Sequence, residues 1–285
     1  MYKYEEAISR NSGFILEKEQ DLLRNSTIAI AGMGGVGASH LVTLARLGFS
    51  KFKISDMDIF ETGNFNRQAG AFISTVNVPK VDAMKKMILD INPEAEIELF
   101  SDGIDSDNVD EFLSGVDMFL DGLDFFVLNI RQEIFAKCHK MGIPAITAAP
   151  TGWGTTYIVF SPDGMSFDDF FSFEEGLDEK EKYIRFYVGL LGKKISLGSL
   201  IDPTGMNIKN QRLSSTASGV YAASAAITAQ AVKVLLKRGD IKCAPYYHQV
   251  DFYNNRFAVG ILRNGNKSIV QKIKLRLARK AFKDE

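Results

Sequence analysis

A cluster of four glycines near the N-terminus is the strongest chemical signal in the sequence. Its members are Gly32, Gly34, Gly35 and Gly37. The first, second and last of them have the G-x-G-x-x-G spacing of loops that let a phosphate approach the backbone closely. The apolar segment Thr27–Ala31 predicts a buried strand before the cluster, and the residues after it predict a helix whose free N–H groups hold phosphate. Asp56, about twenty residues further on, stands where such sites place a carboxylate for ribose hydroxyls. The pattern predicts a nucleotide site without specifying the nucleotide.

A second group of polar side chains follows the ribose-binding position. It consists of Asn64, Arg67, Gln68 and Lys80. Arginine offers a planar fork of donors that matches phosphate oxygens, lysine a compact charge and asparagine neutral donors. A nicotinamide-dependent enzyme has little need of such donors at this position, whereas a site for a triphosphate needs them to bind the phosphate oxygens. Taken singly, Arg67 and Lys80 are typical of solvated surface charges; together with the glycines they favour a triphosphate site.

The elements that must position these residues alternate between strand and helix from residue 27 to residue 147. This alternation predicts an α/β fold, a Rossmann-like, doubly wound and mostly parallel sheet with helices on both faces. Ligands of such sheets bind at the carboxyl ends of the strands. A helix over 214–236 and an antiparallel hairpin over 246–262 are expected to extend the sheet at its C-terminal side.

The stretch 161–212 breaks this alternation. We interpret it as an irregular insertion or lid, because eight acidic residues lie between Asp163 and Glu181 and phenylalanines are interleaved with them. A loop of that length is typical of a lid, a partner surface or a disordered segment. The expected organisation is a nucleotide-binding domain over 1–160, the insertion over 161–212, and a C-terminal part over 213–285 that completes the first domain.

The composition excludes several classes of protein. The 285 residues carry 34 basic and 35 acidic side chains, so no global attraction to nucleic acid is expected. The tail from Arg263 onward, with eight basic residues, is the feature that favours RNA contact; a solvated or dimer-packing tail is the preferred interpretation.

The two cysteines, Cys138 and Cys243, form no CxxC pair, and so few cysteines are typical of a protein of the reducing cytoplasm. Polar residues interrupt the most apolar stretch, 220–236, so no membrane span is expected.

In their order along the chain, the motifs resemble those of the ThiF/MoeB/HesA adenylyltransferases, relatives of the ubiquitin-activating enzymes. The resemblance covers residues 10 to about 160 closely, and the helix over 215–236 more loosely. It rests on Arg10-Asn11, Gly-x-Gly-Gly-x-Gly at 32–37, Asp56-x-Asp58, Asn64-x-x-Arg67-Gln68, Pro79-Lys80, Ile91-Asn92-Pro93 and Asp121-x-x-Asp124. No motif alone is specific, but the ordered set is.

The resemblance implies attack of a carboxylate, at the C-terminus of a protein or peptide, on the α-phosphate of ATP. The products would be an acyl-adenylate and pyrophosphate. The glycine loop would lie under the phosphates, Asp56 would hold the ribose, and Asp124 would bind Mg²⁺. Contacts to the β- and γ-phosphates would come from Asn64, Arg67 and Lys80. In a homodimer, Arg10 would be an arginine finger that reaches the partner's site.

Three departures from the family pattern keep other functions open. The zinc site with two CxxC pairs, common in the family, is absent, and the one downstream cysteine, Cys243, is interpreted as an incidental thiol rather than a thioester nucleophile. Phe125 stands where the family has an asparagine after the metal-binding aspartate. The alternatives are a dehydratase acting on threonylcarbamoyladenosine in tRNA with the same ATP site, a catalytically inactive nucleotide-binding scaffold, and a dinucleotide oxidoreductase.

Overall fold

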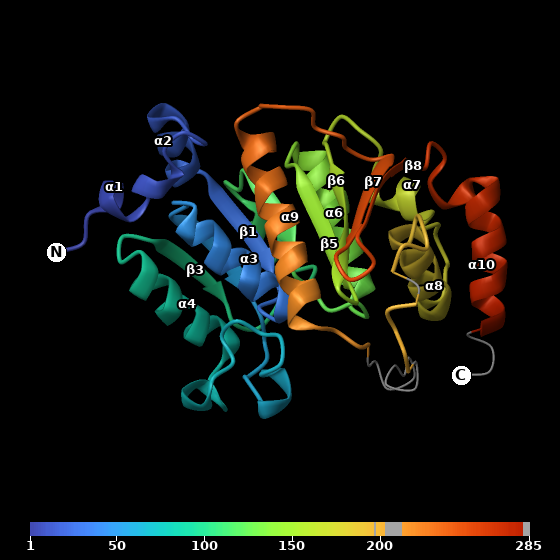
Figure 1. Cartoon of the computed structure of the whole chain (residues 1–285), viewed down its shortest axis with the longest axis horizontal. Coiled ribbons are helices and arrows are strands. Elements are labelled where there is room, and N and C mark those ends of the chain that lie inside the picture. Colours follow the sequence, from blue (N-terminus) through green and yellow to red (C-terminus); the bar gives the residue numbers. More distant parts are fainter. Residues whose placement is uncertain (197, 203–212, 282–285) are drawn as a thin grey trace. The chain divides into compact units, whose positions relative to one another are not determined.

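A computed structural model describes residues 1–196, 198–202 and 213–281. The chain divides into two units. The first unit comprises Met1–Leu123 and Ser224–Ile241, and the second comprises Asp124–Ala223 and Lys242–Glu285. The predicted fold class is confirmed: a Rossmann-like parallel sheet with its helices, followed by a C-terminal helix and an antiparallel hairpin (Figure 1).

The first unit is built on four parallel strands. Its elements in chain order are α1 (Tyr4–Ala7), η1 (Ser9–Asn11), α2 (Glu17–Asn25), β1 (Thr27–Ala31), α3 (Gly35–Arg46), β2 (Lys51–Ser55), η2 (Thr62–Asn64), η3 (Ile73–Thr75), α4 (Lys80–Ile91), β3 (Glu96–Phe100), α5 (Val109–Leu113) and β4 (Met118–Asp121). Strand β1 lies between β2 and β4, and β3 pairs with β2. The central strand β1 is buried along almost its whole length, as its uninterrupted apolar sequence predicts.

Helices pack against this sheet, as the alternation of strands and helices in the sequence predicts. Helices α3 and α4 lie side by side over the strands in Figure 1. In α4, Val81, Met84 and Ile88 are fully buried and repeat at helical spacing, which gives the helix one apolar face. On α5, the ring of Phe112 packs edge-on against aromatic rings of β3 and β4.

Because β1 pairs in parallel with both β2 and β4, the carboxyl ends of these three strands lie at one edge of the sheet, where a ligand site is expected.

The second unit contains four antiparallel strands and a group of helices. Its elements are α6 (Leu128–Met141), β5 (Ala145–Thr151), β6 (Gly154–Phe160), α7 (Phe167–Phe171), α8 (Glu179–Leu190), β7 (Tyr246–Asp251), β8 (Arg256–Ile261), η5 (Gly265–Lys267) and α10 (Ile269–Ala281). Strand β6 lies between β5 and β7, and β7 turns into β8 as the predicted hairpin. Helix α9 (Ala217–Leu235) begins in the second unit and belongs to the first unit from Ser224 onward.

The irregular stretch predicted over 161–212 is wrong for the part that the structure describes. Helices α7 and α8 form there, and the phenylalanines of this stretch are core residues, at most 6% exposed: Phe167, Phe170, Phe171, Phe173 and Phe186. Five of the eight acidic residues lie at the starts of α7 and α8, where carboxylates interact favourably with the positive end of the helix dipole. Asp178, for example, caps α8 by accepting from the N–H of Glu181 at 2.7 Å. Residues 197 and 203–212 of the stretch lie outside the described residues.

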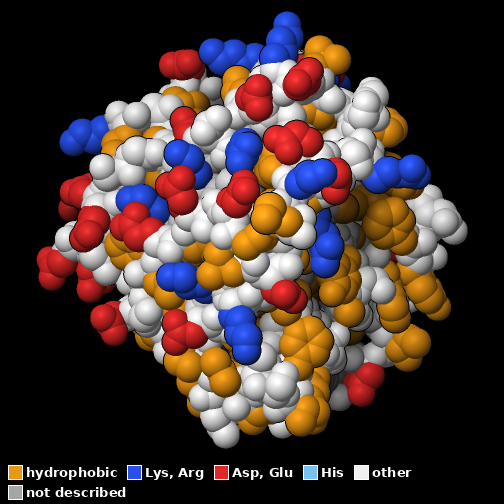
Figure 2. Space-filling view, turned by 90° about the vertical axis from the view of Figure 1, so that its left-hand side faces the viewer, with side chains coloured by type: hydrophobic (Ala, Val, Ile, Leu, Met, Phe, Trp, Pro, Cys, Tyr) orange, Lys and Arg blue, Asp and Glu red, His pale blue; other side chains and the backbone are white. Residues whose placement is uncertain are grey.

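The basic tail that starts at Arg263 contains η5 and, from Ile269 to Ala281, the helix α10; residues 282–285 lie outside the described part. On the face shown in Figure 2, basic and acidic side chains are intermingled. This agrees with the nearly balanced charge of the whole chain, whose net charge is −1. Among the described helices, none combines the length and the apolar character needed to cross a membrane.

Candidate nucleotide site

The glycine loop between β1 and α3 is shaped by close contact between backbone segments. Gly32 has φ +89°, a left-handed conformation that glycine adopts without strain. A side chain at Gly37 would collide with the carbonyl oxygen of Gly32, and one at Gly32 would collide with that of Gly122, directly after β4. Three backbone segments therefore touch at the edge of the sheet, and none of these three positions has room for a Cβ atom.

Gly34, at the start of α3, has different surroundings. A Cβ atom placed there would meet only the Nε2 atom of Gln68, at 3.9 Å. Gln68 is 8% exposed, and its Oε1 atom has no hydrogen-bond partner among the described residues. An open glycine at a helix N-terminus, beside a buried amide with unused hydrogen-bonding capacity, fits a polar ligand that approaches the loop.

Asp56 joins this loop to the end of β2. Its carboxylate accepts a hydrogen bond from the backbone N–H of Met33 at 2.6 Å and one from the N–H of Asp58 at 2.8 Å. The Lys80 ammonium lies 3.8 Å from Asp56 and 2.7 Å from the carboxylate of Asp58. Burial raises the pKa of Asp56 above its usual value, against the opposing effects of Lys80 and the two N–H donors. The carboxylate is thus fixed against the loop while its acceptor capacity is only partly used.

Lys80 is buried, with 7% of its side chain exposed, at the first position of α4. Pro79 precedes it in extended conformation, and the backbone N–H of Lys80 donates to the carbonyl of Asp58 at 2.9 Å. A buried ammonium is costly unless it is paired, so its place beside two carboxylates and the glycine loop is specified by the fold. The side chain of Asp58 is 65% exposed, which makes it a partner that a phosphate can replace.

Asn64 and Arg67 lie on the turn that begins with η2. The Oδ1 atom of Asn64 accepts from the N–H of Glu61 at 3.0 Å, and its Nδ2 group has no partner among the described residues. Arg67 donates to the carbonyl of Gly63 at 3.2 Å and to Asn66 at 2.8 Å, and within the described chain it pairs with no carboxylate. Both side chains thus keep donors available for an anion.

The structure therefore brings together the loop, Asp56 and Lys80 through a hydrogen bond and an ion pair, and Gln68 through its proximity to the loop. The N–H groups of Arg67 and Gln68 both bond the carbonyl of Asn64, so the same turn carries all three side chains.

Arg10 lies elsewhere in the first unit. It belongs to η1, it is exposed, and its guanidinium makes no hydrogen bond or ion pair with a described residue. The neighbouring Asn11 donates to the carbonyl of Leu47 at 3.1 Å, at the C-terminal cap of α3. Helix α3 has 12 residues. This corresponds to about 18 Å between its two ends. The glycine loop is at the other end, so Arg10 does not lie in the site of its own chain.

Asp124 opens the second unit. It is exposed, and its Oδ1 atom accepts from the N–H of Phe126 at 3.0 Å. Phe125 packs its ring against the rings of Phe126 and Phe186, with centroid distances of 5.1 and 5.4 Å. The position that carries asparagine in the resembled family is thus used here for aromatic packing. Within the described ranges, no group of three or more His, Cys, Asp or Glu side chains is arranged to hold a metal ion.

Sequence reasoning assigned no role to two residues of the site, although it named one of them, Asp58, in the motif Asp56-x-Asp58. Asp58 is the closest partner of Lys80, and its position two residues after Asp56 signals it. Gly122 closes the backbone contact beneath the loop, and the only local signal is that it follows the last residue of a predicted strand.

Taken together, a Rossmann-like sheet with a glycine turn, a carboxylate at the end of β2 and a buried lysine has the features of an α/β nucleotide-binding protein. The model of the ThiF family matches residues 8–268. The chain belongs to the ThiF family.

Named relatives share parts of the sequence. The tRNA threonylcarbamoyladenosine dehydratase of Bacillus subtilis is 46% identical over 89 residues, which are 31% of this chain and 35% of the relative. The molybdopterin-synthase adenylyltransferase of Haemophilus influenzae is 29% identical over 150 residues, covering 51% of this chain and 61% of the relative. The chain thus spans about a third to three fifths of the length of these relatives.

Solved structures share the fold over most of the chain. Escherichia coli MccB with ATP is similar with a TM-score of 0.66 and 18% identity, covering 89% of this chain and 69% of that one. PaaA gives a TM-score of 0.67 and 20% identity, with 90% and 72% coverage. At these identities the similarity shows the fold alone.

Proposed function

We propose that this protein catalyses the ATP-dependent adenylation of a carboxylate. The observation that carries the proposal is the buried Lys80, held beside Asp56 at the open glycine loop. The fold resembles that of MccB, which was solved with ATP, and membership of the ThiF family further supports the proposal. Nucleotidyl transfer requires the protein to position the reactants and to stabilise negative charge on the phosphates, with no covalent intermediate on the protein. Lys80 and the N–H groups of the loop can supply this stabilisation.

In the proposed reaction, a carboxylate oxygen of the substrate attacks the α-phosphorus of ATP. The bond from that phosphorus to the oxygen bridging to the β-phosphate breaks, and pyrophosphate leaves with the bonding electrons. Asp56 accepts hydrogen bonds from the ribose. Donors for the β- and γ-phosphates come from Asn64, Arg67 and Lys80, which stabilise the charge on the departing pyrophosphate. Lys80 moves from Asp58 to the phosphates as ATP binds.

Asp124 is the proposed protein ligand of Mg²⁺. Its Oδ1 atom accepts from the N–H of Phe126, whereas its Oδ2 atom makes no hydrogen bond with a described residue, so this oxygen remains for a cation. Mg²⁺ in nucleotide sites takes one or two carboxylates from the protein and most other ligands from phosphates and water. One free carboxylate therefore fits the metal of an ATP complex. When bound, the ion would neutralise phosphate charge.

Arg10 is proposed to act in the site of a second copy of the chain, in a homodimer. Its segment is tied to the far end of α3, which keeps it from the loop of its own chain. The guanidinium is exposed and uncommitted, as an arginine finger requires before the partner's ATP is present.

The proposed substrate is the C-terminal carboxylate of a protein or peptide, of the ubiquitin-like or sulfur-carrier type. Neither cysteine favours a thioester step within the chain. Burial raises the pKa of Cys138 to about 12, and it also raises the pKa of the half-buried Cys243. Because the thiolate is the nucleophile, we expect the acyl-adenylate to react with an external acceptor.

The test is pyrophosphate exchange into ATP, screened over ubiquitin-like proteins and short peptides as carboxylate substrates. Lys80→Ala is expected to abolish exchange, whereas Lys86→Ala, an exposed lysine on the same helix, is expected to leave it unchanged. Because losing Lys80 leaves the buried Asp56 without its cation, Arg67→Ala is the second variant; its contacts are confined to its own turn. Undiminished exchange in both folded variants would contradict the assigned roles.

A second candidate is a tRNA threonylcarbamoyladenosine dehydratase-like activity at the same ATP site. It is favoured by the 46% identity over 89 residues with the Bacillus subtilis enzyme of that name and by the basic residues of α10. A salt-dependent gel shift with tRNA would support it, because phosphate contacts release counterions. The absence of a shift at low salt would count against it.

A further inference from the structure

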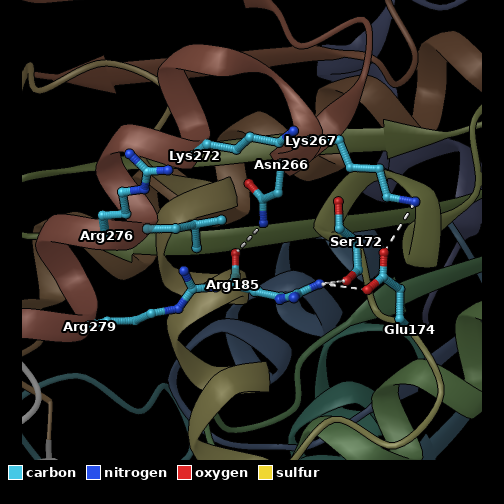
Figure 3. A pocket seen from close by; sticks show the side chains of 9 residues that line it. Ser172, Glu174, Arg185, Asn266, Lys267, Lys272, Arg276 and Arg279 are labelled. Carbon is cyan, nitrogen blue, oxygen red and sulfur yellow. Dashed lines mark hydrogen bonds and ion pairs between the residues drawn. The ribbon is translucent and has the colours of Figure 1, made fainter.

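A cavity of about 410 Å³ in the second unit lies outside the nucleotide site. Helices α8 and α10, η5 and the turn after α7 supply its lining (Figure 3). Its size is within the range of pockets that bind small molecules. The wall is cationic, with five basic side chains: Arg185, Lys267, Lys272, Arg276 and Arg279.

The carboxylates nearby do not balance this charge. Glu174, in the lining, pairs with Lys267 at 3.3 Å. Glu181, just outside it, bonds Arg185 at 2.7 Å and also pairs with Arg279. Five positive and two negative side chains leave a net charge of +3. An anion in the cavity would remove this imbalance.

Two of the cations have no partner of their own. The side chains of Lys272 and Arg276 make no hydrogen bond or ion pair with a described residue, and no dashed line reaches them in Figure 3. They lie one turn apart on α10, and Arg279 follows on the same face. Like charges at this spacing repel each other, so three cations along one helix face favour a shared anionic ligand.

Ser172 provides an independent sign of a missing ligand. It lines the cavity, is 4% exposed, and its Oγ atom has no hydrogen-bond partner among the described residues. Its φ of +58° is that of the left-handed C-terminal cap of α7. A buried hydroxyl without a partner is typical of a position kept for binding.

The lining is also held rigidly. Arg185 donates to the carbonyl of Ser172 and to Glu181, which fixes its guanidinium at the wall. Asn266, 1% exposed, donates to the backbone carbonyls of Phe171 and Arg185 at 2.9 and 2.8 Å. Donors that are fixed before binding lose little entropy when a ligand arrives.

We propose that this cavity binds a small phosphate-bearing molecule, whose negative charge is balanced by cations of the wall that include Lys272 and Arg276 and which also contacts the hydroxyl of Ser172. Arginine forks match phosphate oxygens, and a charge of +3 suits a multiply charged phosphate better than a single carboxylate. The volume exceeds what an orthophosphate ion alone occupies, so the ligand carries an organic part or a second phosphate. The proposal does not depend on the adenylation reaction.

The experiment is calorimetric titration of the whole protein with fructose 1,6-bisphosphate, which lacks the adenine of ATP, and with citrate as a non-phosphate anion. We expect the bisphosphate to bind at least about tenfold more tightly than citrate. The double variant Lys272→Gln/Arg276→Gln should weaken it by at least about tenfold. The matched control, Arg263→Gln/Lys280→Gln, removes the same charge from exposed positions outside the cavity and should bind normally.

The variant Ser172→Ala tests whether the hydroxyl of Ser172 serves ligand binding or the stability of the fold. It should weaken binding without lowering the unfolding temperature, because it removes a hydroxyl that no described residue satisfies. Pyrophosphate exchange should be unchanged in the double variant, so failure here and failure of the proposed function are distinguishable.

The proposal would be overturned if the wild type bound no phosphate ester, if citrate bound equally well, or if the double variant and its control behaved alike. Binding of RNA without binding of the bisphosphate would equally overturn it, since it would identify α10 as a nucleic-acid surface.

Discussion

Substitution by alanine should have different effects at two glycines of the same loop: it should lower stability at Gly37 and weaken ATP binding at Gly34. Gly37→Ala places a methyl group against the backbone carbonyl of Gly32, inside van der Waals contact. Gly34→Ala places one 3.9 Å from the end of a flexible side chain, at an ordinary contact distance and with an ordinary φ of −77°. The first change strains the fold, whereas the second occupies space above the loop.

The magnitudes follow from these surroundings. Relief of the Gly37 clash requires backbone movement, and overpacking of this kind costs about 3 kcal/mol or more. That is a large part of the stability of a typical protein, about 5–15 kcal/mol. Alanine in place of glycine at the start of a helix costs less than about 1 kcal/mol. Displacing a phosphate from one or two loop N–H groups, however, costs about 2–3 kcal/mol, or roughly 30- to 150-fold in affinity.

Urea unfolding and calorimetric titration with ATP measure the two effects separately. Gly37→Ala should lose stability, and Gly34→Ala should keep it but bind ATP weakly. Gly164→Ala, in a turn where the nearest atom is 3.4 Å away, is the control and should change neither quantity. Wild-type ATP affinity in Gly34→Ala would refute the placement of phosphate at the loop, and wild-type stability in Gly37→Ala would refute the backbone contact.

Three further predictions concern single residues. Mixing equal amounts of Arg10→Ala and Lys80→Ala should restore about a quarter of wild-type exchange, because half of randomly formed dimers contain one intact site; no restoration would show that Arg10 does not act across a dimer. Gln68→Met should weaken ATP binding in calorimetry without loss of stability, since the Oε1 atom that it removes has no described partner; a destabilised variant would contradict this. Burial lowers the pKa of His40 from 6.5 to about 3, so its folded form stays neutral while the unfolded chain gains a proton below pH 6.5. Stability should therefore fall by about 2 kcal/mol between pH 7 and pH 5 in urea unfolding, and His40→Leu should lack this loss.

The proximity of Asp56, Lys80 and the glycine loop in the candidate nucleotide site was predictable because its determinants are local. Asp56 and the glycine loop each follow a buried strand, and neighbouring parallel strands bring their carboxyl ends together. Lys80 follows Pro79, which marks the start of a helix. Gly122 was not predictable, because its contact with Gly32 depends on the pairing of β4 with β1 across some ninety residues of chain.

The misassigned insertion shows which local signal was overlooked. Ser166 and Asp178 stand at the N-caps of α7 and α8, each with an acidic residue three positions later. This spacing is typical of a helix start, and it accounts for most of the acidic residues of the stretch. The basic tail signalled four of the five cations of the cavity wall, but the cavity itself was not predictable, because Glu181 meets Arg279 only after α8 and α10 pack together.

Helix α3 gives the first unit two ends with different tasks. Its N-terminus carries the open glycine loop, and its C-terminal cap binds the segment that carries Arg10. The Nδ2 group of Asn11 donates to the carbonyl of Leu47 and to the Oε1 atom of Gln20, so the segment is fixed by two side-chain hydrogen bonds. A rigid helix therefore sets the distance between the phosphate site and the arginine of one chain. If the arginine acts on ATP at all, it must come from a second copy, and a site that is complete only in the dimer makes catalysis depend on association.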